Sequence, residues 1–141
     1  MSPNAQPVNF LYPKQSRRMS KKDISNFRAW HKRAALNAKE AGFDIVYVYA
    51  GHGMSVAQQF ILPDMNNRTD EYGGSLENRL RLTRELLEET QEAIGDSCGV
   101  AFRFAVDELK GKDGMQFKEE GRAVVELLSE HPDLWLSLIH I

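Results

Sequence analysis

Two side chains that could do chemistry lie where the most apolar run of the sequence ends. The run from Ile45 stops at Tyr49, and three residues later His52 stands between two glycines. A phenol can present its ring or its oxygen to a substrate cation, and an imidazole beside it can hold or move a proton. The same spacing also fits a tyrosine in the core and a loop histidine bonded to a backbone carbonyl, so both interpretations stay open on spacing alone.

A third candidate, Arg103, interrupts a second apolar run, Gly99 to Val106. A guanidinium in such a run is unfavourable unless it is paired, because removing a charge from water is costly. One interpretation is a buried salt bridge with an acidic residue elsewhere in the protein. The other is contact with a bound cofactor.

The composition is that of an ordinary globular chain. Its 141 residues are 42% hydrophobic and 27% charged, with a formal net charge of -2. Because acidic and basic residues are interspersed, we expect neither nucleic acid nor a membrane as a partner.

The single cysteine, Cys98, can form neither an internal disulfide nor a structural zinc site. No apolar run approaches the ~20 residues of a membrane-spanning helix. We therefore expect a cytoplasmic protein without a metal site in this chain.

The hydrophobic pattern predicts alternating helices and strands after an irregular connecting segment at residues 1–20. Ile24, Phe27, Trp30, Ala34 and Ala38 recur at helical spacing, which predicts a first helix that ends at a glycine. The further elements predicted along the chain are a strand at 43–49, a helix at 75–94, a strand at 99–106, a helix at about 117–129 and a last short apolar run at 133–139.

The lengths of the connections indicate the fold. Turns from helix to strand are tight, whereas the segments that follow the two strands, 50–74 and 107–116, are long. In a (β/α) barrel the long strand-to-helix loops form the active-site face. We therefore predict an α/β chain with parallel strands that forms a partial TIM (β/α)8 barrel of about three βα units. A complete barrel has eight units and about 250 residues, so we expect this chain to be a piece of a longer protein, called the parent protein below.

Several motifs together resemble the flavin-binding barrel of the old yellow enzyme family, in particular its amine dehydrogenase branch. They are AGFDIVYVYAGHG, QF, NNRTDEYGGSLENRLRL and AFRFAVDEL, and the match covers most of Lys21 to Trp135. The resemblance implies an FMN-dependent oxidoreductase. It predicts a partial FMN-binding TIM barrel at residues 21–135 and a tail at 136–141 that does not match the family.

The resemblance also implies roles for the candidate residues. Tyr49 and His52 fall where the family keeps its paired substrate-facing residues; YxxH resembles the amine-oxidising branch, and HxxN or HxxH the ene-reductases. Arg103 would face the flavin and stabilise negative charge on the reduced ring. Met54 stands where many ene-reductases have a proton-donating tyrosine. The residue types of RTDEYGGSLENR themselves indicate a mostly structural role, in which Arg68, Asp70, Glu77 and Arg79 would lock the loop that carries the pair.

The function expected from the resemblance is dehydrogenation and demethylation of a methylated amine by hydride transfer to FMN. The alternative substrate is an enone, reduced by a flavin-dependent enoate or 2,4-dienoyl reductase. In the third possibility the chain alone is a catalytically inactive fragment that cannot bind FMN, because the remaining barrel strands lie outside it. A 4Fe-4S cluster, if the parent protein has one, would also lie outside these residues.

Overall fold

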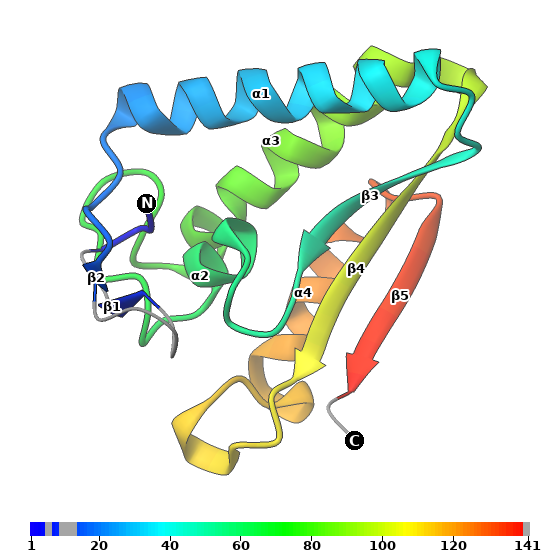
Figure 1. The fold of residues 1–141 in the computed structure, drawn as a ribbon. Helices are drawn as coiled ribbons and strands as arrows, with labels where there is room; N and C mark the ends of the chain where they lie inside the picture. Colours follow the sequence, from blue (N-terminus) through cyan, green and yellow to red (C-terminus); the bar gives the residue numbers. More distant parts are fainter. Residues whose placement is uncertain (5–6, 9–13, 140–141) are drawn as a thin grey trace.

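The computed structural model describes residues 1–4, 7–8 and 14–139, and its elements follow the predicted alternation (Figure 1). Parts of the predicted segment 1–20 and the last two residues of the predicted tail lie outside this description. The helices are α1 (Lys21–Glu40), α2 (Val56–Ile61), α3 (Leu76–Ile94) and α4 (Arg122–Leu128). The strands are β1 (Pro7–Val8), β2 (Lys14–Gln15), β3 (Ile45–Ala50), β4 (Gly99–Asp107) and β5 (Leu134–Ile139). Short helical turns lie at Gly95–Ser97, Gly111–Asp113 and Phe117–Gly121.

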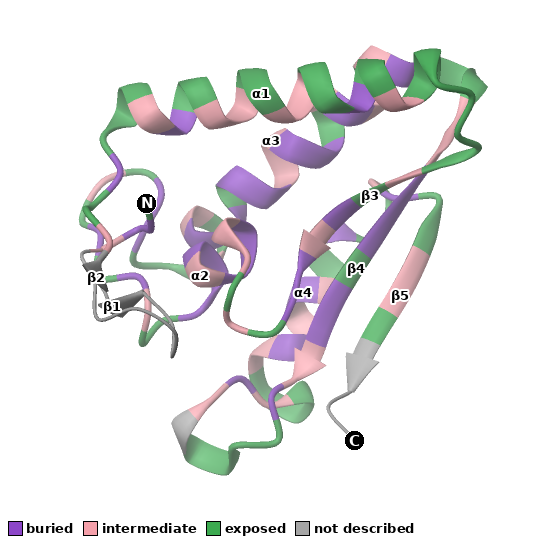
Figure 2. Ribbon diagram, viewed as in Figure 1, coloured by how far each residue is buried: buried purple, intermediate pink, exposed green. Residues whose placement is uncertain are grey.

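The main sheet consists of three parallel strands in the order β3-β4-β5, which confirms the predicted strand direction. Alternation along each strand gives the sheet two different faces. One face is buried against the helices and contains Val48 and Phe102, both 0% exposed. The other face has no cover among the described residues and leaves Tyr47 49% and Leu134 43% exposed. In a closed barrel this uncovered face points to the interior. Figure 2 shows the buried residues gathered on α3, β3 and β4.

The two long helices begin at side-chain caps. Ser20 forms a capping box with Asp23 at the start of α1, and Ser75 accepts the Asn78 N–H at the start of α3. Helix α1 lies across α3, as Figure 1 shows, but the predicted face of α1 is partly wrong. Trp30 is 57% exposed and Ala34 is also exposed, whereas Ile24 and Ala35 are buried.

The inward stripe of α1 passes through His31 in place of Trp30. The His31 side chain lies within hydrogen-bond distance of Thr90 Oγ1 on α3, at 3.3 Å from Nδ1. Burial lowers the pKa of His31, because the charged imidazolium is less well solvated there. A polar residue can thus occupy the helix contact, while the larger Trp30 points outward.

Two local features differ from the predicted element boundaries. Helix α2 lies inside the segment that was expected to be one long loop, and Ser55 caps it by accepting the Gln58 N–H. The predicted helix at 117–129 begins as a π-helical turn, Phe117–Gly121, before α4. Both differences lie on the side of the sheet where the strands end.

Gly73 allows two segments of backbone to approach more closely than any side chain would permit. A Cβ atom at Gly73 would lie 2.3 Å from the Arg68 carbonyl oxygen. We expect Gly73→Ala to lower the free energy of unfolding of the parent protein by about 1–3 kcal/mol, as overpacking does. Thermal unfolding measures this change. Gly99→Ala is the matched control, because its Cβ would meet nothing closer than 3.9 Å; equal effects of the two substitutions would contradict the prediction.

Candidate functional site

The structure brings the three predicted site residues together where the carboxyl end of β3 lies beside the middle of β4. Tyr49 and Arg103 are register partners in the parallel ladder, so their side chains share the uncovered face of the sheet. The guanidinium carbon of Arg103 lies 5.7 Å from the centroid of the Tyr49 ring, within the range of a cation–π contact. His52 follows two residues after the last residue of β3.

Tyr49 and His52 are hydrogen-bonded to each other through Tyr49 Oη and His52 Nδ1. Their ring centroids are 6.0 Å apart and the rings are tilted by 42°. Which atom donates depends on the histidine tautomer. The pair can therefore pass a proton between a phenol and an imidazole.

An open pocket of about 580 Å³ lies on the uncovered face of the sheet, beside Tyr49 and Arg103. Its lining residues are Tyr47, Tyr49, Arg103, Leu136 and Ser137. Arg103 is exposed there, and no carboxylate in the described part of the chain forms a salt bridge with it. A fixed positive charge beside an aromatic ring in such a pocket can bind a planar or anionic group.

The loop that carries His52 adopts an unusual backbone conformation. His52 has φ 60°, in the left-handed region that non-glycine residues seldom occupy, and Gly53 continues it with φ 63°. The Gly51 N–H donates to Ser55 Oγ at 3.2 Å. The Gly53 N–H donates to Gln58 Oε1, and Gln59 Nε2 donates to the Gly53 carbonyl. These contacts of α2 were not predicted from the sequence, although a serine at position 55 is a recognisable N-cap residue.

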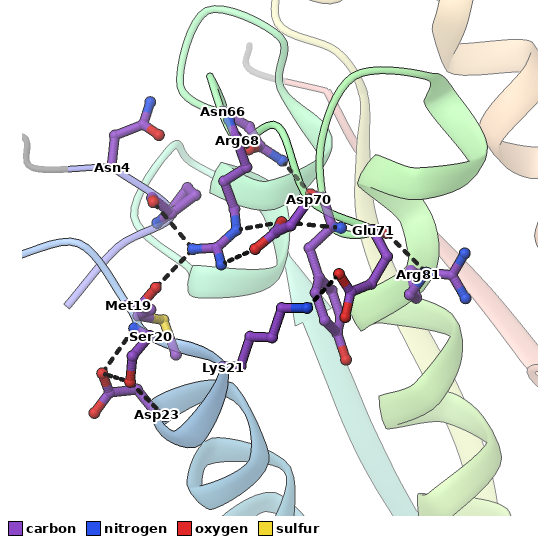
Figure 3. Close-up of polar contacts among 12 residues, drawn as sticks. Asn4, Met19, Ser20, Lys21, Asp23, Asn66, Arg68, Asp70, Glu71 and Arg81 are labelled. Atoms are coloured by element: carbon purple, nitrogen blue, oxygen red, sulfur yellow. Dashed lines mark hydrogen bonds and ion pairs between the residues drawn. The ribbon is translucent and has the colours of Figure 1, made fainter.

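The motif RTDEYGGSLENR folds around the buried Arg68 (Figure 3). Arg68 makes two bonds to Asp70, from Nε at 2.9 Å and from Nη2 at 2.5 Å, and donates to the Met19 carbonyl at 2.6 Å. Hydrogen bonding from Arg68 lowers the pKa of the Asp70 carboxyl. This one side chain thereby ties the loop after α2 to the segment before α1.

Arg79 makes a second connection from the start of α3. Its guanidinium donates to the Gly74 carbonyl at 3.2 Å, to the Ile61 carbonyl, and to Glu120 at 2.5 Å. These contacts join the end of α2 to the turn before α4. They agree with the predicted locking role of Arg68, Asp70 and Arg79. Glu77 instead serves its own helix, since backbone and Ser75 hydrogen bonds lower its pKa at the first turn of α3.

Tyr72 connects the same motif to a charged cluster between α1 and α3. The Tyr72 hydroxyl donates to Glu85 at 3.0 Å, and Arg28 lies between Glu85, at 3.2 Å, and Glu89. Burial raises the pKa of Glu85 and of Tyr72, because each loses solvation of its charged form. None of these side chains lines the pocket, and the bond from Tyr72 to Glu85 joins the motif to α3.

Within the described ranges, no group of three or more histidine, cysteine, aspartate or glutamate residues could hold a metal ion. A helix of the length and apolar character needed to cross a membrane does not occur in this part of the chain.

The chain is similar in sequence to a known protein family and to proteins of known activity. The NADH:flavin oxidoreductase / NADH oxidase family matches residues 3–141. Dimethylamine dehydrogenase of Hyphomicrobium sp. (strain x) is 42% identical over 113 residues, which are 80% of this chain and 15% of that protein.

Two solved structures are also similar. The 6-hydroxypseudooxynicotine amine oxidase of Pseudomonas geniculata N1 has a TM-score of 0.94 and 46% identity, covering 99% of this chain and 21% of its own. Histamine dehydrogenase from Rhizobium sp. 4-9 has a TM-score of 0.89 and 42% identity, and the match covers 96% of this chain and 20% of the histamine dehydrogenase chain. The chain thus spans about a fifth or less of the length of these proteins. Similarity to solved structures confirms the predicted fold, a partial (β/α)8 barrel with parallel strands.

Proposed function

The chain belongs to the NADH:flavin oxidoreductase / NADH oxidase family, and from this premise we propose that its parent protein is an FMN-dependent dehydrogenase of a methylated amine. The observation that carries the proposal is that Tyr49, hydrogen-bonded to His52, shares one pocket with Arg103. The YxxH spacing resembles the amine-oxidising branch. Three similar proteins whose names include an amine substrate also support amine oxidation over enone reduction.

The residues present fit FMN. Arg103 offers an exposed guanidinium with no carboxylate partner in the described part of the chain, on the face that points into a barrel. Such a cation would hold the flavin ring and favour the negative charge that the ring gains on reduction. When bound, FMN supplies an acceptor for the hydride that leaves the C–H bond next to the amine nitrogen.

Tyr49 and His52 act on the amine in this proposal. The Tyr49 ring faces the substrate cation. Tyr49 Oη accepts a proton from the ammonium nitrogen while it passes its own proton to His52 Nδ1, to which it is bonded, so that the amine becomes neutral and the imidazole becomes charged. A neutral amine releases hydride more readily, because its lone pair stabilises the carbon that becomes an iminium. Water then hydrolyses the iminium to an aldehyde and the demethylated amine.

Anaerobic titration of the purified parent protein tests the proposal. We expect dimethylamine or a related N-methyl amine to bleach the flavin absorbance, with one aldehyde formed per flavin reduced. The matched control is tert-butylamine, which has no C–H bond next to nitrogen and should leave the spectrum unchanged. Bleaching only by a nicotinamide donor, with reoxidation by an enone, would contradict the proposal and favour the reductase. Iron and sulfide content of the same sample shows whether the parent protein also contains a 4Fe-4S cluster.

A further inference from the structure

Two consecutive glutamines on α2 hold both polar groups of the Gly53 backbone. The Gly53 N–H donates to Gln58 Oε1 at 2.5 Å, and Gln59 Nε2 donates to the Gly53 carbonyl oxygen at 3.0 Å. These backbone partners define the orientation of both amides, because an N–H requires an acceptor and a carbonyl requires a donor. Gln58 thus uses its oxygen and Gln59 its nitrogen.

The contacts act directly beside a strained residue. His52, the neighbour of Gly53, has φ 60°. A non-glycine residue keeps this conformation only where the surrounding structure enforces it. On the other side of His52, the Gly51 N–H is held by Ser55 Oγ. The backbone on both sides of His52 is therefore held by side chains of α2 and of its N-cap residue.

Packing alone does not explain two glutamines at these positions. Gln58 is 0% exposed. The remaining amide atoms, Gln58 Nε2 and Gln59 Oε1, are buried without a hydrogen-bond partner in the described part of the chain. Buried polar atoms without partners are unfavourable, and methionine would fill similar space without them. The two hydrogen bonds to the Gly53 backbone are the favourable interactions that offset this unfavourable burial.

We propose that Gln58 and Gln59 are positioning residues for His52. By holding Gly53 they keep His52 in the left-handed conformation that places its Nδ1 against Tyr49 Oη. Neither glutamine touches the substrate in this scheme; both act through His52. The inference rests on the proposed function, because it assigns the glutamines to the Tyr49 and His52 pair.

The first test removes each amide in the parent protein. We expect Gln58→Met and Gln59→Met to lower the limiting rate of flavin reduction by an amine by about 10- to 100-fold. The half-saturating amine concentration and the FMN content should change little, since Arg103 and the pocket stay intact. Gln116→Met is the matched control, because the Gln116 side chain has no bond to this loop, and it should leave the rate unchanged.

A double-mutant cycle separates positioning from general damage. In a His52→Gln background, the methionine variants should lower the remaining rate by less than about twofold, because coupled residues are not additive. Equal slowing in both backgrounds would overturn the inference. If Gln58→Met loses FMN, the same cycle with Gln59→Met and His52→Gln tests the positioning role, because Gln59 is only half-buried.

A pair of isosteric variants tests the direction of the bonds. Gln58→Glu keeps an oxygen for the Gly53 N–H, whereas Gln59→Glu in its ionised form removes the donor to the Gly53 carbonyl. We expect Gln59→Glu to be slower than Gln58→Glu by about tenfold or more. Burial of charge alone predicts the opposite order, because Gln58 is the more buried residue. That opposite order would overturn the inference.

The outcomes also distinguish this inference from the proposed function. If His52→Gln leaves the rate of flavin reduction unchanged, the assigned role of the pair is wrong and the positioning role falls with it. If His52→Gln slows reduction but the methionine variants do not, the positioning role alone is wrong.

Discussion

His52→Gln in the parent protein is expected to lower the rate of flavin reduction by a methylated amine by about 10²- to 10⁴-fold, the usual contribution of a general acid or base. Glutamine keeps the length and polarity of the side chain but cannot take a proton from Tyr49 Oη, to which His52 Nδ1 is bonded. FMN should remain bound, because Arg103 on β4 is untouched. Anaerobic stopped-flow absorbance measures the rate, and the absorbance spectrum of the purified protein measures FMN content.

Two further variants control this prediction. Tyr49→Phe removes the hydroxyl that the imidazole contacts and should also slow reduction while FMN is retained. His131→Gln makes the same histidine substitution before β5, at the other end of the sheet, and should leave the rate within about twofold of the wild type. Loss of bound flavin in parallel with the loss of rate in His52→Gln and Tyr49→Phe would contradict the assigned roles.

Arg68→Met is expected to lower the free energy of unfolding of the parent protein by about 3 kcal/mol, as removal of one partner from a buried ion pair does. The value lies at the low end of such effects because the Asp70 side chain is 23% exposed and remains partly solvated, whereas that of Arg68 is 3% exposed. The substitution also leaves the Met19 carbonyl without its donor. Thermal or denaturant unfolding of the parent protein measures the change.

The matched control is Arg122→Met, which removes an exposed salt bridge with Glu126, four residues later on α4. We expect it to cost only about 0.3–0.5 kcal/mol. A loss in Arg68→Met no larger than in this control would show that the Arg68 contacts contribute little.

The pH dependence of stability gives a second measurement of the same contact. Arg68 lowers the pKa of Asp70 in the folded protein. The contact therefore stabilises fully above the unfolded-state pKa of about 3.9 and is lost as the pH falls through the lower folded-state value. The difference in unfolding temperature between the wild type and Arg68→Met should thus narrow below about pH 4. A constant difference across this range would exclude the Asp70 carboxylate as the cause.

Much of the fold followed from local pattern. The apolar runs around Tyr49 and Arg103 predicted two strands of the parallel sheet, and the long segments after them indicated the side of the sheet for the candidate site. Helix α2 could not be recognised in the same way, because six residues are too few to show a helical period. Trp30 was assigned to the wrong face for a related reason: a stripe of spacing three or four can pass through either Trp30 or His31, and only the contact with α3 decides.

The sequence by itself determined the residue types of the candidate site and their strands, through apolar runs, loop lengths and family motifs. Only the tertiary structure decided that Tyr49 lies opposite Arg103, because a shift of one residue in the strand register would turn either side chain to the other face of the sheet. It also decided the conformation of His52. A left-handed backbone at a histidine is locally unfavourable, so it depends on hydrogen bonds from α2 that no local pattern specifies.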